Sequence, residues 1–106
     1  MIAEPRIREI ILESLKEIVD SKMVPKDFDV NDNTILIGMG GNLDSVSFVA
    51  FATDVEEKIE EGIGREFILK LQEIHDLNEG KNALIVKDMV RLLAKIINQQ
   101  SVHAKR

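Results

Sequence analysis

The stretch GGNLDSVSFVAF, residues 40–51, contains the side chain that is best placed for chemistry, the hydroxyl of Ser45. Glycines precede Ser45 in what reads as a flexible loop, and valines, phenylalanines and alanines follow it with helical spacing. A helix cap would explain this hydroxyl, with Asp44 or Ser45 accepting N–H bonds in the first turn. A modification site would explain it equally, because the free N–H groups and the dipole of an uncharged helix start attract a phosphate.

Two neighbouring patterns have features of ligand-binding loops but lack essential residues. In DFDVNDN, residues 27–33, acids and amides alternate as in a calcium loop. However, Asp32 stands where that loop needs glycine, and Gly38 stands where it needs the bidentate glutamate. The segment GMGGN, residues 38–42, lacks the Lys-Ser/Thr pair of a phosphate-binding loop. We therefore expect neither a calcium site nor a nucleotide-binding loop.

No catalytic set is recognisable elsewhere in the chain. His75 and His103 lie far apart in the sequence, and we expect both to be solvated rather than to act as a base or a metal ligand. The absence of cysteine excludes disulfides, thiolate metal sites and a cysteine nucleophile. No Ser-His-Asp triad can be assembled from these residues. We expect a protein that is not itself an enzyme and that binds no metal.

Hydrophobic periodicity predicts the elements that must position Ser45. Apolar residues recur at three- and four-residue steps in three segments, residues 5–19, 45–61 and 84–97. A shorter apolar segment, residues 67–76, predicts a minor helix. Residues 22–44 are expected to form one long loop, because the TILI run within them has no evident partner strand. The predicted fold is all-α, a small bundle of three main helices plus one short helix, with the long loop between the first and second helices.

Composition narrows the classes of partner. A chain of 106 residues with 44% hydrophobic content suits one globular domain. The formal net charge of −5 and the absence of Trp and Tyr argue against binding to nucleic acid. No apolar run is long enough for membrane insertion, and the N-terminus does not read as a signal peptide. We expect a cytoplasmic monomer in which residues 1–100 form the helical domain and residues 101–106 a disordered polar tail.

The run LIGMGGNLDSVSFVAFATDVEEKI, residues 36–59, resembles the acyl carrier protein family, whose signature is Asp-Ser-Leu or a near variant at the start of the second helix. The residues that match this signature are Asp44, Ser45 and Val46. Leu36 and Gly38 resemble the leucine and glycine of the preceding loop, and ALIVKDMVRLLAKII, residues 83–97, resembles the last helix. Ile85 stands where the family often has Thr or Ser, so the cap of the last helix must differ.

This resemblance implies that Ser45 carries a 4′-phosphopantetheine arm, transferred from coenzyme A by a phosphopantetheinyl transferase. An acyl or aminoacyl cargo would ride on the arm as a thioester and would be presented to the enzymes that load and use it. In this family an acyl chain can also fold back among the helices. Ser47 and Ala50 replace acids that are common after the family's serine, which favours a specialised stand-alone carrier.

One face of the second helix is expected to meet partner enzymes. With about 100° between successive residues, the outward side contains Val46, Ala50, Asp54, Glu57 and Glu61. The inward side contains Phe48, Phe51, Ala52, Val55 and Ile59. Partners would read the part of the outward face near Ser45 by apolar contact and the farther part by Lys or Arg. The alternative is an unmodified helical adaptor that docks basic partners through this acidic face and uses Ser45 only as a cap.

Overall fold

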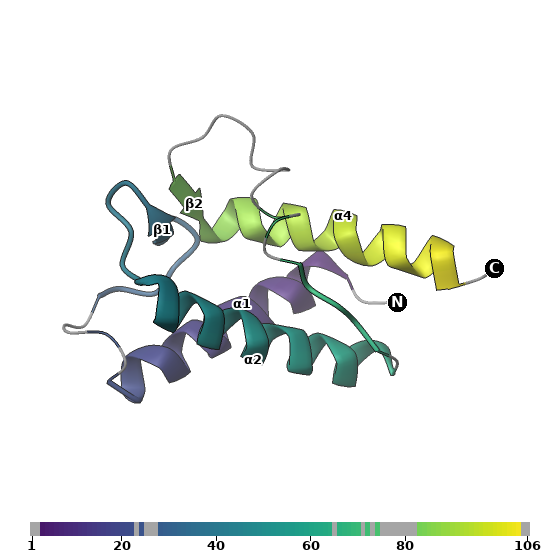
Figure 1. The fold of residues 1–106 in the computed structure, drawn as a ribbon, viewed down its shortest axis with the longest axis horizontal. Helices are drawn as coiled ribbons and strands as arrows, with labels where there is room; N and C mark the ends of the chain where they lie inside the picture. The colour runs from purple at the N-terminus through teal and green to yellow at the C-terminus, as the bar shows by residue number, and fades with distance from the viewer. Residues whose placement is uncertain are drawn as a thin grey trace.

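The computed structural model describes residues 3–22, 24, 28–64, 66–70, 72, 74 and 83–104. The elements in chain order are α1 (Glu4–Asp20), β1 (Ile35–Gly38), α2 (Ser45–Ile63), β2 (Ala83–Ile85) and α4 (Val86–Ala104). α1 packs against both α2 and α4, and the two strands pair at the end of the bundle where α2 and α4 begin (Figure 1). The predicted small helical fold is therefore confirmed in its three main helices.

Local sequence explains where the first two helices begin and end. Pro5 lies in the first turn of α1, where backbone N–H groups have no intrahelical acceptor, so the N–H that proline lacks is not needed. α2 ends at Ile63 and is capped by Gly64, whose φ of 71° is left-handed and whose N–H donates to the Glu60 carbonyl. All five residues predicted for the inward side of α2 are buried. The 3.6-residue period thus identified the face that α2 turns to the core.

A two-stranded antiparallel sheet corrects the all-α prediction. β1 includes most of the TILI run that we expected to remain loop, and it interrupts the long loop predicted over residues 22–44. The register is Ile35↔Ile85, Ile37↔Leu84 and Gly38↔Ala83. Leu84, predicted as the first residue of the last helix, lies in β2 instead, and α4 begins at Val86.

Backbone carbonyl groups cap the start of α4. The N–H of Val86 donates to the Thr34 carbonyl and the N–H of Lys87 donates to the Asp32 carbonyl, both at 3.0 Å. The Asp32 side chain also pairs with Arg8 of α1 at 2.6 Å. The loop before β1 therefore supplies the acceptors that a Ser or Thr side chain would otherwise provide.

The structure describes two other predicted segments in part. Residues 66–70, which include the start of the predicted short helix, are irregular. Beyond them only Gln72 and Ile74 are described and helical, so the extent of that helix lies outside the described residues. α4 continues past its expected end at Ile97 to Ala104, and is thus helical within the segment predicted as a disordered tail.

The hydrophobic core is formed by the inward faces of the three helices together with β1 and β2. Phe67 and Ile74, from the segment that follows α2, are buried in the same core. None of the described helices combines the length and the apolar character needed to cross a membrane.

Candidate functional site

A tight glycine turn leads the chain from β1 towards Ser45. The N–H of Gly41 donates to the Gly38 carbonyl at 2.9 Å. Gly38 and Gly40 have φ values of 102° and 76°, which favour glycine. A Cβ atom on Gly41 would lie 2.8 Å from the Cα atom of Ile37, so no side chain fits there. The glycines that read as a flexible loop in the sequence instead build a defined turn.

Further hydrogen bonds tie the end of this turn to β1. The backbone N–H and the side-chain Nδ2 of Asn42 both donate to the Ile35 carbonyl, at 3.1 and 2.9 Å. The N–H of Leu43 donates to the Leu36 carbonyl at 2.9 Å, and both leucine side chains are buried. Because the chain is anchored up to Leu43, the first turn of α2 has a defined position relative to the sheet.

Asp44 and Ser47 together cap α2. Asp44 Oδ1 accepts the Ser47 backbone N–H at 2.8 Å, and Ser47 Oγ accepts the Asp44 backbone N–H at 3.0 Å. These two bonds form a reciprocal capping box. The hydrogen bonds from the Ser47 N–H and the Ser47 hydroxyl lower the pKa of Asp44. The choice between Asp44 and Ser45 as the capping side chain is therefore settled in favour of Asp44.

Ser45 is the first residue of α2, and it is exposed. Within the described part of the chain the Ser45 hydroxyl forms no hydrogen bond, because Asp44 and Ser47 make the cap. The first turn of α2 contains no acidic side chain. The Asp44 carboxylate, at the N-cap, is the acidic group at this end of the helix and already accepts the Ser47 N–H.

The structure divides the five residues predicted for the outward face of α2. Val46, which is 72% exposed, lies at the surface together with Glu57 and Glu61. Ala50 is half-buried and packs against the core. Asp54 is also half-buried and binds a lysine on its own helix. Three of the five residues are therefore freely accessible to a partner.

Lys58 joins Asp54 to α1. The Lys58 ammonium group bonds to the Asp54 carboxylate, to Glu17 Oε2 at 2.9 Å and to the buried Ser14 hydroxyl at 3.4 Å. Burial alone would lower the pKa of Lys58, but the hydrogen bonds to Asp54 and Glu17 outweigh burial and raise it. Burial alone would raise the pKa of Asp54, but hydrogen bonds from Lys58 and Ser14 lower it overall. Asp54 thus contributes to the contact between α1 and α2.

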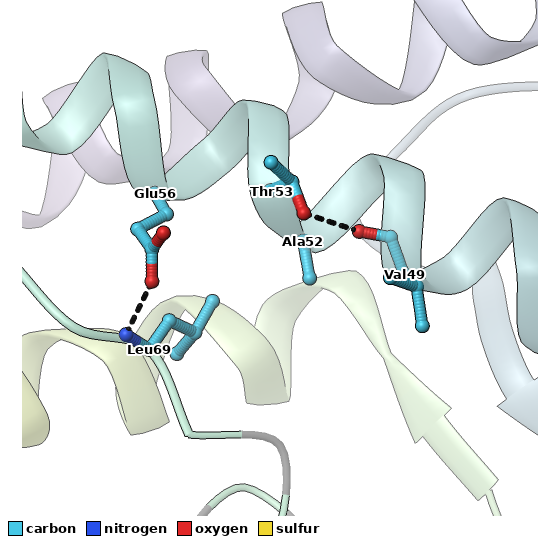
Figure 2. Close-up of a pocket in the computed structure, with 5 residues that line it drawn as sticks. All are labelled: Val49, Ala52, Thr53, Glu56 and Leu69. Carbon is cyan, nitrogen blue, oxygen red and sulfur yellow. Dashed lines mark hydrogen bonds between the residues drawn. The ribbon is translucent and has the colours of Figure 1, made fainter.

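A shallow pocket lies between α2 and the segment that follows it (Figure 2). Its volume is about 120 Å³. The residues that line it are Val49, Ala52, Thr53, Glu56 and Leu69. The Thr53 hydroxyl donates to the Val49 carbonyl at 2.9 Å, which satisfies that donor within the helix. The pocket is therefore mainly apolar, with the Glu56 carboxylate as its charged group.

Two carboxylates of α2 hold residues 66–70 beside this pocket. Glu56 Oε2 accepts the backbone N–H of Leu69 at 2.7 Å, as Figure 2 shows, and Glu60 Oε2 accepts the backbone N–H of Phe67 at 3.2 Å. Glu56 and Glu60 lie one helical turn apart, so they meet alternate residues of the neighbouring segment. The buried Phe67 side chain anchors the same segment in the core. Leu69 of this segment thus forms one wall of the pocket.

Sequence reasoning did not indicate several residues of the candidate site and its surroundings. Val49 is 50% exposed beside Val46, and a helical wheel centred on the buried face would have placed it at the edge of the outward side. Met39, at the glycine turn, is also exposed. The sequence contains no signal of the hydrogen bond from the Leu69 N–H to Glu56, because this bond depends on the path of an irregular segment.

The sequence predicted neither a metal site nor a catalytic histidine. Across the parts of the chain that the structure describes, no three His, Asp or Glu side chains are grouped so that they could hold a metal ion. His75 lies outside the described residues, and His103 is in the last turn of α4.

The chain has no match among family models, curated proteins or solved structures. Inferences about its function therefore come from the geometry around Ser45.

Proposed function

We propose that this chain is an acyl carrier protein, a stand-alone cytoplasmic carrier with a 4′-phosphopantetheine arm on the Ser45 hydroxyl. One observation carries the proposal. Asp44 and Ser47 cap α2, while Ser45 between them is exposed and, among the described residues, forms no side-chain hydrogen bond. A serine that served only to start the helix would be expected to take part in the cap. Because Asp44 and Ser47 make the cap, the Ser45 hydroxyl can be modified without loss of a capping bond.

The surroundings of Ser45 suit the attachment of a phosphate group. Beyond the Asp44 cap, the first turn of α2 has no acidic side chain, so no further carboxylate repels a phosphate group attached to Ser45. The glycine turn is bonded to β1 through Asn42 and Leu43, so the hydroxyl is offered to an enzyme in one orientation of the backbone. The residues present therefore fit the proposed group.

In the proposed reaction the Ser45 oxygen attacks the phosphorus of coenzyme A that bears the pantetheine. The Oγ–P bond forms, the pyrophosphate P–O bond breaks, and adenosine 3′,5′-bisphosphate leaves, while a base of the transferase takes the hydroxyl proton. Among the described residues no titratable side chain is hydrogen-bonded to Ser45, so the chain supplies the nucleophilic oxygen and the transferase supplies the base. When bound, the arm supplies a thiol that holds the cargo as a thioester.

The exposed face beside Ser45 is where the transferase and the enzymes that load and use the cargo would approach. Val46 makes the part nearest Ser45 apolar, and Glu57 and Glu61 make the farther part acidic. A partner with a small apolar surface flanked by Lys or Arg fits this distribution.

The proposal is tested by incubating the protein with a broad-specificity phosphopantetheinyl transferase and coenzyme A, and then measuring its intact mass. The wild-type chain should gain one phosphopantetheinyl increment, and Ser45→Ala should gain none. Ser21→Ala is the matched control, because Ser21 is also exposed but lies in the turn after α1. An increment that survives in Ser45→Ala would contradict the assignment.

The rival function is an unmodified adaptor that docks through the acidic face of α2. Such an adaptor needs the exposed Glu57 and Glu61 but has no use for a hydroxyl at Ser45. The same experiment separates the two functions, because an adaptor would gain no mass in a mixture where a known carrier protein is modified.

A further inference from the structure

We propose that the pocket beside α2 receives a short cargo that bears an amino group, and that Glu56 is the residue that selects it. This inference rests on the proposed carrier function, because the cargo would reach the pocket only while tethered to Ser45. It names the cargo class, aminoacyl instead of plain acyl, that the resemblance to acyl carrier proteins leaves open.

The pocket lies on the face of α2 that begins at Ser45. Val49, Ala52 and Glu56 follow Ser45 by four, seven and eleven residues, a spacing that keeps side chains on one side of an α-helix. At a rise of 1.5 Å per residue, Glu56 lies about 16 Å from Ser45 along the helix axis. A tether that starts at Ser45 therefore passes Val49 and Ala52 before its far end reaches Glu56.

The size of the pocket limits the length of the cargo. Its volume is about 120 Å³, whereas a cavity of about 150 Å³ in a protein holds a molecule the size of benzene. A group of a few heavy atoms fits this space. A longer chain would have to displace the wall at Leu69, which is bonded to Glu56, or remain in solvent.

The charge of Glu56 determines which short cargo fits best. Its Oε2 atom accepts one hydrogen bond, from the Leu69 N–H, whereas an ionised carboxylate offers about four acceptor positions. Within the described residues no Lys or Arg forms an ion pair with Glu56. A hydrocarbon chain would remove water from this charge without replacing the lost hydrogen bonds. An ammonium group would donate a charge-assisted hydrogen bond to it.

The test compares two cargoes of equal size that differ in charge. A transferase would load Ser45 from amide analogues of acyl-coenzyme A that carry pentanoyl, 4-aminobutanoyl or decanoyl groups, and NMR would follow the backbone amides of Val49, Ala52 and Leu69. The 4-aminobutanoyl group should shift all three resonances and occupy the pocket about fivefold more than pentanoyl, as expected for an ion pair worth about 1 kcal/mol. Decanoyl should give no larger shifts than pentanoyl, because its extra carbons do not fit.

Glu56→Gln is the matched variant, because its amide oxygen can still accept the Leu69 N–H while the charge is lost. This variant should abolish the difference between the two short cargoes, whereas Glu9→Gln, an exposed site on α1, should preserve it. The proposal is overturned if pentanoyl and 4-aminobutanoyl give equal shifts, if their difference persists in Glu56→Gln, or if decanoyl gives the largest shifts. Failure to load any cargo would show in the intact mass, and would count against carrier function itself.

Discussion

The carboxylate of Asp44 and the hydroxyl of Ser47 accept hydrogen bonds from each other's backbone N–H groups across the first turn of α2, at 2.8 and 3.0 Å. This pair completes the cap of the helix, and Ser45 lies between its two members without taking part. Helix stability and the proposed modification therefore depend on different side chains, and each can be removed separately.

Removal of the cap should destabilise the protein, whereas removal of the modification site should not. We predict that Asp44→Ala lowers the free energy of unfolding by about 1 kcal/mol, the usual cost of losing an N-cap side chain. Ser45→Ala should change it by less than about 0.5 kcal/mol, because the Ser45 hydroxyl is exposed and has no hydrogen-bond partner among the described residues. Urea unfolding followed by circular dichroism measures both values. Equal losses in the two variants would mean that Ser45 shares in the cap.

The Asp44 cap should also make stability depend on pH. Hydrogen bonds from the Ser47 backbone N–H and hydroxyl lower the pKa of Asp44 in the folded protein. A carboxyl group with a lowered folded pKa stabilises the fold above its unfolded pKa, about 3.9, and this contribution is lost as the pH falls through the folded pKa. The wild-type chain should therefore lose stability more steeply than Asp44→Asn below about pH 4. Parallel urea midpoints for the two proteins across that range would refute this prediction.

The Lys58 network should stabilise the contact between α1 and α2. Lys58→Met removes the cation that binds Asp54 and Glu17, and leaves both carboxylates without it. We predict a loss of about 1 kcal/mol in the free energy of unfolding, in the upper range for partly exposed ion pairs, and a smaller loss at high salt. Lys16→Met, at an exposed site on α1, is the control and should have little effect. If both variants lose the same amount, the network contributes nothing specific.

The exposed acids of α2 should influence how fast a transferase finds Ser45. We predict that the double variant Glu57→Lys and Glu61→Lys slows modification of Ser45, and slows it more at low salt than at high salt, because rim charges act mainly on association. Asp54 is left unchanged, because loss of its ion pair with Lys58 would alter the stability of the fold as well as docking. Thermal unfolding should confirm that the double variant melts close to the wild-type temperature. Modification at the wild-type rate in low salt would show that these acids only face solvent.

The main helices could be predicted because each one buries a single stripe of its surface. Phe51, Val55 and Ile59 of α2 recur at the spacing of one helical face, and all three are completely buried. The strands could not be predicted in the same way. β2 has three residues, and its apolar pattern continues without a break into α4, so Leu84 reads as part of the helix. Only the pairing with β1 distinguishes the two elements.

The candidate site was predictable in part. Position 45 stood out because Asp44-Ser45-Val46 follows a glycine-rich loop and begins an apolar helix. The partner of Asp44 in the cap was not evident, because Ser47 carries no signal that separates it from any other serine in a helix. A helical wheel likewise placed Asp54 on the outward face, but did not show that Lys58 joins it to Glu17 of α1. Contacts of this kind depend on which side chains meet in three dimensions.

The most direct test of the central claim is to locate the modification within the chain. After treatment with a transferase and coenzyme A, tryptic digestion should release residues 27–58 as one peptide, because no Lys or Arg lies between Lys26 and Lys58. The hydroxyl-bearing residues in that peptide are Thr34, Ser45, Ser47 and Thr53. Fragmentation in a mass spectrometer should place the whole phosphopantetheinyl increment on Ser45 and none on Ser47, which is buried in the cap. An increment on Ser47, or on any residue other than Ser45, would contradict the account.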